Sequence, residues 1–154
     1  MARPPAKELA PCSGKCHCAD MDTNTSVALL IEDEPLIAMD LEMAFSTEGF
    51  DVTTVLSCQE AMEWLAICRP DIVVVDVMLR DGPSDKVVQL LIEEAIPFIV
   101  HSGDQPDMHV GTPFANGRWV SKPAEHGALI NAAREMAHWR TGLECCSGSR
   151  RFQK

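Results

Sequence analysis

The run "DIVVVD", residues 71–76, constrains the fold of this chain more than any other stretch. Its four central residues are all apolar and β-branched, which is typical of a strand that is buried on both faces. Such strands form parallel sheets that helices cover on each side. The run ends in Asp76, and a carboxylate at the end of a buried strand is costly unless charges or hydrogen bonds compensate it.

The rest of the chain alternates between predicted strands and predicted helices. Apolar runs predict further strands near residues 27–31, 50–55, 97–103 and 117–123. Apolar side chains at helical spacing predict helices over residues 35–48, 57–69, 84–94 and 124–140. The prolines and glycines of residues 103–118 leave room for at most a short helical turn. The alternation predicts an α/β fold with a doubly wound, five-stranded parallel sheet, right-handed crossovers and a short or irregular fourth helix.

Composition fits one domain and argues against several partners. With 154 residues and 46% apolar content, we expect one domain over residues 26–140, between a flexible extension, 1–25, and a flexible tail, 141–154. The net charge of −10 disfavours nucleic acid and anionic membranes as partners. No apolar run reaches the roughly 20 residues of a membrane-spanning helix, and no secretory signal is evident. We therefore expect a cytoplasmic protein.

The seven cysteines have two kinds of setting. Cys58 and Cys68 fall in a helical pattern and are predicted to be small buried hydrophobic residues. The others lie near the chain ends, where a soft metal or cross-links are conceivable, but the spacing matches no zinc signature and favours reduced thiols. These terminal cysteines are Cys12, Cys16, Cys18, Cys145 and Cys146, and His17 lies beside the first three as a further possible metal ligand. Met21 is an alternative start of the chain, which the sequence leaves open.

Polar side chains stand where four of the predicted strands end. Glu32 and Asp33 follow the first strand, Asp76 the third, Ser102 the fourth and Lys122 the fifth. Ligands of open α/β sheets bind at this edge, beyond the carboxyl ends of the strands. Three carboxylates repel one another there, and a hard divalent cation such as Mg²⁺ removes that cost. With a lysine and a hydroxyl beside them, the site favours a metal ion together with a phosphoryl group.

The motifs "LLIEDEP", "VVVDVML", "VHSG" and "WVSKP" occur in this order, and the chain resembles the receiver domain of bacterial two-component response regulators over about residues 26–140. The resemblance implies the flavodoxin-like strand order 2-1-3-4-5. It also implies a phosphoacceptor protein, not an enzyme, that takes a phosphoryl group from a sensor histidine kinase or a histidine phosphotransfer protein. A stand-alone receiver, monomeric or weakly dimeric, would then act on an unknown downstream protein or serve as a phosphorelay intermediate or phosphate sink.

The same resemblance implies a role for each site residue. Asp76 would be the phosphoacceptor, with Mg²⁺ held by Glu32, Asp33, Asp76 and the backbone carbonyl of Met78. Lys122 would pair with the phosphoryl oxygens. Ser102 would turn toward the phosphoryl group, and Trp119 would follow into the space vacated.

Each of these residues also has a structural interpretation. The acidic pair could be a solvated turn, Lys122 a surface lysine, Ser102 a turn residue and Trp119 part of the core. The family usually has Tyr or Phe at Trp119, and the stunted fourth helix puts the usual output surface in doubt. Met78 cannot orient water by hydrogen bonding, although Asp104 could, so we expect modest self-dephosphorylation. The histidines receive no role: His101 and His126 are expected near the rim, and His109 and His138 at the surface.

Two other functions remain open at this point. One is a receiver-like interaction module that is never phosphorylated, which the intact Asp33, Asp76 and Lys122 disfavour. The other is a metal-dependent phosphohydrolase with Asp76 as nucleophile, which lacks any cap domain or substrate pocket of its own.

Overall fold

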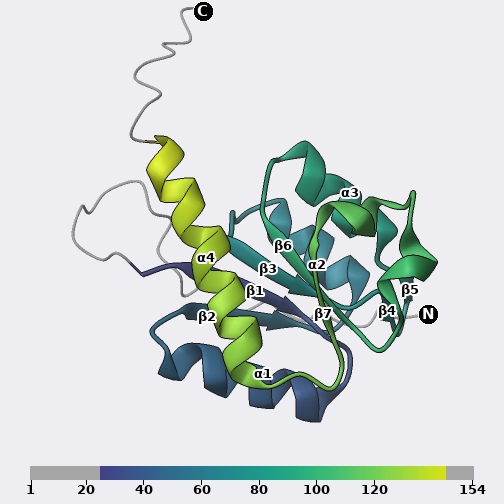
Figure 1. The fold of residues 1–154 in the computed structure, drawn as a ribbon, viewed down its shortest axis with the longest axis horizontal. Coiled ribbons are helices and arrows are strands. Elements are labelled where there is room, and N and C mark those ends of the chain that lie inside the picture. The colour runs from purple at the N-terminus through teal and green to yellow at the C-terminus, as the bar shows by residue number, and fades with distance from the viewer. Residues whose placement is uncertain (1–24, 145–154) are drawn as a thin grey trace, which may run out of the picture.

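The structure, a computed structural model, describes residues 25–144, with side chains to residue 137. Its central sheet contains β1 (Val27–Ile31), β2 (Asp51–Val55), β3 (Ile72–Val75), β6 (Phe98–Ser102) and β7 (Arg118–Ser121). All neighbours pair in parallel, in the order β2-β1-β3-β6-β7 (Figure 1). Numbered by themselves, the five strands have the order 2-1-3-4-5. The predicted fold class is confirmed.

Helices cover both faces of this sheet (Figure 1). The helices are α1 (Pro35–Thr47), α2 (Cys58–Leu65), α3 (Asp85–Glu93) and α4 (His126–Glu144). Side chains of α2 and α3 pack in one core cluster with Leu29, Val73 and Val100. Side chains of α1 and α4 pack in a second cluster on the other face with Leu30 and Val74. Because side chains alternate between faces along a strand, each apolar run supplies both cores.

Local sequence signals explain where two helices begin and end. At the end of α1, Gly49 has a φ of +92°, a left-handed conformation that glycine adopts without strain. The N–H groups of Gly49 and Phe50 donate to the carbonyls of Ser46 and Phe45, and the two phenyl rings lie 5.2 Å apart. At the start of α2, Ser57 Oγ accepts from the N–H of Glu60, a hydrogen bond that caps the helix.

The structure differs from the predicted elements in three places. Helix α2 ends at Leu65, before Cys68, and α4 runs from His126 to Glu144 rather than over 124–140. Gly142 lowers helix propensity without breaking a helix, so the pattern could not fix that end. A two-residue antiparallel pair, β4 (Met78–Leu79) and β5 (Gly82–Pro83), forms in the loop after Asp76 and was not predicted.

The segment between β6 and β7 contains only two short 3₁₀ helices. These are η1 (Pro106–His109) and η2 (Pro113–Asn116), each beginning at a proline. This confirms the prediction of no more than short helical turns here. Phe114 of η2 is buried and anchors the segment against the core on the α2–α3 face.

The two cysteines predicted to be buried are only partly buried. Cys58 stands at the first position of α2, where its thiol contacts the carbonyl oxygens of Gly82 and Pro83. Burial and the nearby carboxylate of Asp81 raise the pKa of this thiol to about 11, so it is a poor nucleophile at neutral pH. Cys68 follows the end of α2 and is likewise only partly buried.

Several predictions fall on residues outside the described part of the chain. They concern the extension and tail cysteines, His17, the alternative start at Met21 and the side chain of His138. Among the described helices, none combines the length and the apolar character that crossing a membrane requires.

Candidate functional site

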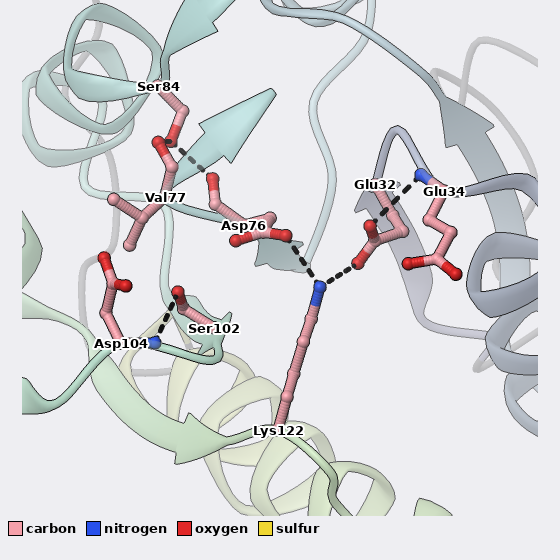
Figure 2. Close-up of polar contacts among 8 residues, drawn as sticks. All are labelled: Glu32, Glu34, Asp76, Val77, Ser84, Ser102, Asp104 and Lys122. Atoms are coloured by element: carbon pink, nitrogen blue, oxygen red, sulfur yellow. Dashed lines mark hydrogen bonds and ion pairs between the residues drawn. The ribbon is translucent and has the colours of Figure 1, made fainter. Parts of the chain in front are cut away.

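The structure brings the five predicted strand-end residues to one edge of the sheet. Glu32 and Asp33 follow β1, Asp76 follows β3, Ser102 ends β6, and Lys122 follows β7. Because all five strands are parallel, their carboxyl ends meet along this edge. In Figure 2 the side chain of Lys122 extends across the site toward Asp76 and Glu32.

Lys122 is the central contact of the site. Its ammonium nitrogen donates to Asp76 Oδ2 at 2.6 Å and to Glu32 Oε2 at 2.8 Å (Figure 2). Burial by itself lowers the pKa of the amine, but the bonds to Asp76 and Glu32 outweigh this effect and raise the pKa. The lysine therefore stays charged and partly neutralises the two carboxylates.

Glu32 is the most deeply buried acid of the site, with a side chain only 4% exposed. Desolvation raises its pKa, although Lys122 and the N–H of Glu34 oppose that rise. The Glu34 N–H donates to Glu32 Oε1 at 3.2 Å. The side chain of Asp76 is 14% exposed. The Asp76 carboxylate is therefore partly open to solvent while it contacts Lys122.

Three carboxylates gather closely enough to share a cation. Oxygens of Glu32, Asp33 and Asp76 all lie within 4.8 Å of one another, the one such cluster among the described residues. Carboxylate oxygens are the ligands that Mg²⁺ prefers, and a cation there would offset the charge that Lys122 alone leaves uncompensated. The residues therefore fit a hard divalent ion. A contribution from the Met78 carbonyl stays a prediction.

Two residues that the sequence did not indicate support the phosphoacceptor candidate and its neighbours. The hydroxyl of Ser84, which is fully buried, donates to the main-chain carbonyl of Asp76 at 2.6 Å (Figure 2). Arg80, in the turn between β4 and β5, donates to the main-chain carbonyl of Asp33 at 3.1 Å. Both contacts tie loops together, and no periodic pattern in the sequence marks them.

Ser102 and Trp119 lie on the same face of the sheet. The register pairs Val100 with Trp119 and Ser102 with Ser121, and paired residues of parallel strands point to the same side. Trp119 packs against the α2–α3 core cluster. Ser102 is buried, and its Oγ accepts from the N–H of Asp104 at 3.2 Å (Figure 2). Ser102 and Trp119, which the resemblance implies would move together, therefore lie on the same face of the sheet.

The histidines differ in part from expectation. His126 is at the rim and contacts Asp40 at 2.7 Å. His101 is buried on the opposite face from Ser102, and burial lowers its pKa to about 4. The surface assignment of His109 is wrong: its side chain is 15% exposed, because it packs against two aromatic rings of the irregular segment and β7.

Comparisons with known proteins agree with this geometry. The profile of the family described as "Response regulator receiver domain" matches residues 28–134. The phyllosphere-induced regulator PhyR of Methylorubrum extorquens is 32% identical over 141 residues, 82% of this chain and 49% of that protein. The transcriptional regulatory protein TrcR of Mycobacterium tuberculosis is 40% identical over 120 residues, 75% of this chain and 47% of that protein.

Solved structures show the same fold. The signal receiver domain of a putative Luxo repressor protein from Vibrio parahaemolyticus has a TM-score of 0.72 at 18% identity, over 81% of this chain and 99% of that one. The aligned part of this chain covers about half the length of the curated relatives, between 49% and 53% for three of them.

Proposed function

Because this chain belongs to the response regulator receiver domain family, we propose that it accepts a phosphoryl group on Asp76 and signals through that modification. The observation that carries the proposal is the joint contact of Lys122 with Asp76 and Glu32, beside a cluster of three acids. A partly exposed carboxylate in reach of an ammonium group is the arrangement that a phosphorylated carboxylate needs.

The transfer itself forms one bond and breaks one. An Asp76 carboxylate oxygen attacks the phosphorus of a phosphohistidine on a sensor histidine kinase or histidine phosphotransfer protein. The phosphorus–nitrogen bond breaks, and its electron pair stays on the imidazole, which takes up a proton. Phosphoryl transfer depends mainly on positioning and charge stabilisation, and Lys122 supplies a cation for the phosphoryl oxygens.

Mg²⁺, bound by Glu32, Asp33 and Asp76, would neutralise negative charge as the phosphoryl group arrives. Ser84 holds the main chain of Asp76 through its 2.6 Å hydrogen bond. Arg80 holds the main chain of Asp33 in the same way. These two contacts restrain the main chain at two of the three acids.

Incubation with Mg²⁺ and a small phosphodonor such as acetyl phosphate tests the proposal. Intact-protein mass spectrometry should show a gain of one phosphoryl group, and Asp76→Asn should abolish it. Asp51→Asn is the matched control, because Asp51 is exposed at the opposite end of the sheet, at the start of β2. Equal incorporation by the Asp76→Asn variant would refute the assignment. No incorporation by the unsubstituted protein would favour an interaction module that is not phosphorylated.

The wider context of the protein stays a prediction. Several relatives are named as transcriptional regulators, and one as a DNA-binding response regulator. The expectations of no nucleic-acid partner, a monomer or weak dimer, a cytoplasmic location and no enzymatic activity remain those of the sequence. Phosphotransfer profiling against the sensor kinases of the host would identify the phosphodonor.

A further inference from the structure

We propose that His109 is a positioning residue that holds Trp119 in the resting protein and couples it to Ser102 through Asp104. The inference rests on the proposed function, because it concerns how the switch side chains respond to a phosphoryl group on Asp76. It concerns a residue of the irregular segment that neither the family motifs nor the sequence pattern singled out.

Two contacts fix the ring of His109. Its imidazole stacks on the indole of Trp119, with ring centroids 5.2 Å apart and an interplanar angle of 28°. The same ring meets Phe114 edge-on at 5.4 Å. Since Phe114 is buried in the core, the imidazole is held between a fixed ring and Trp119.

A third contact ties His109 to the site. Its Nε2 lies 3.0 Å from Asp104 Oδ2, and the N–H of Asp104 donates to Ser102 Oγ at 3.2 Å. A continuous chain of contacts therefore runs from Ser102 through Asp104 and His109 to Trp119. Turning Ser102 Oγ toward a phosphoryl group on Asp76 would stretch the bond to Asp104 and loosen the far end of this chain.

The indole of Trp119 is held by packing and not by its polar atom. Its Nε1 is buried and has no hydrogen-bond partner among the described residues. A buried donor without a partner costs free energy, so the ring keeps its place through the core and the stack on His109. A side chain held in this way is poised to move when the stack is weakened.

Movement of His109 would also change the surface. It is the last residue of η1, and its neighbours Met108 and Val110 are 71% and 77% exposed. Release of the imidazole would shift the backbone that presents these two apolar side chains. A rearrangement of buried side chains would thereby change the position of the exposed side chains of Met108 and Val110.

Fluorescence of Trp119 tests the inference. Trp64→Phe and Trp139→Phe leave Trp119 as the sole indole of the chain. In this background, His109→Ala should increase acrylamide quenching of Trp119 without any ligand, because the ring that covers one face of the indole is gone. His109→Phe should restore the low quenching, since it keeps the stack. Unchanged quenching in His109→Ala overturns the positioning role.

Titration with Mg²⁺ and beryllofluoride, a mimic of the phosphoryl group, tests the coupling. If the stack stabilises the resting state, its loss should tighten beryllofluoride binding by roughly 3- to 10-fold, the range expected for one aromatic pair. Asp104→Asn keeps the stack and the backbone bond to Ser102 but removes the carboxylate charge that faces His109 Nε2, so it should reduce the response of Trp119 to beryllofluoride. It also serves as a milder variant if His109→Ala does not fold.

His126→Ala is the matched control, because His126 makes a similar imidazole–carboxylate contact with Asp40 and has no stacking contact with Trp119 in the described structure. It should leave quenching and affinity unchanged. Beryllofluoride binding with the same affinity in His109→Ala overturns the coupling while the proposed function stands. Absence of binding in the unsubstituted protein overturns the proposed function and the coupling together, and quenching without ligand still decides the role of His109.

Discussion

Lys122 Nζ lies 2.6 Å from Asp76 Oδ2, and this contact joins the ends of two strands that are not neighbours in the sheet. Strand β6 separates β3 from β7, so the lysine side chain reaches past the end of β6 to the phosphoacceptor candidate. The same ammonium group contacts Glu32 at the end of β1. One cation thus holds the ends of three strands, and the acidic edge depends on it.

Replacing Lys122 by methionine should destabilise the protein in the absence of Mg²⁺. The change leaves Glu32 and Asp76 without their cation, and removing one partner of a buried ion pair costs about 3–5 kcal/mol. The loss should shrink at low pH, where the carboxyls take up protons, and on addition of Mg²⁺, which replaces the missing charge. Urea unfolding with and without Mg²⁺ measures both effects.

Lys86→Met is the control for that experiment, because Lys86 is exposed on α3 and should show little change. An Lys122→Met variant as stable as the parent in EDTA would contradict the structural role of the lysine.

Ser84→Ala should loosen the loop that carries Asp76. The hydroxyl bonds the main-chain carbonyls of Asp76 and Val77 from a fully buried position, and the lost bonds should cost about 1–3 kcal/mol of unfolding free energy. Binding of Mg²⁺ and beryllofluoride should weaken as well, which isothermal titration calorimetry would measure. Ser46→Ala, on the exposed side of α1, should change neither quantity.

Much of this site follows from the sequence because its residues stand directly after apolar runs. Asp76 and Lys122 could be placed at one edge as soon as the strands were predicted to be parallel, since that rule fixes where strand ends meet. The contacts of Ser84, Arg80 and His109 could not be placed in this way. They depend on the path of loops that have no periodicity, and only the folded chain shows which loops touch.

The pH dependence of the unfolding free energy should show the titration of His101. Burial lowers its pKa from 6.5 to about 4 in the folded protein, so between these values the unfolded chain binds more protons. Stability then rises with pH across this window, and acidification from pH 6.5 to 4 removes roughly 3 kcal/mol through this group. His101→Leu and His101→Gln should both lose this component in urea unfolding at several pH values.

The two substitutions separate titration from packing at this position. Leucine should also raise stability at neutral pH, because neither nitrogen of His101 has a hydrogen-bond partner among the described residues. Glutamine, which is also polar, should not raise stability at neutral pH. If the free energy curves of parent and variants run parallel from pH 7 to 4, His101 is not the titrating group.

Gly117→Ala should destabilise the protein through one close approach. The backbone of Gly117, with a φ of −93°, suits any residue, but an added Cβ would lie 2.3 Å from a ring carbon of Phe98. That ring is buried and cannot turn away, so the overpacking should cost about 1–3 kcal/mol.

Gly127→Ala is the control: nothing lies within 4 Å of its Cβ, and a helix favours alanine by roughly 1 kcal/mol. Thermal unfolding of the two variants should therefore shift in opposite directions, and an unchanged midpoint in Gly117→Ala would show that β6 and η2 are less tightly packed.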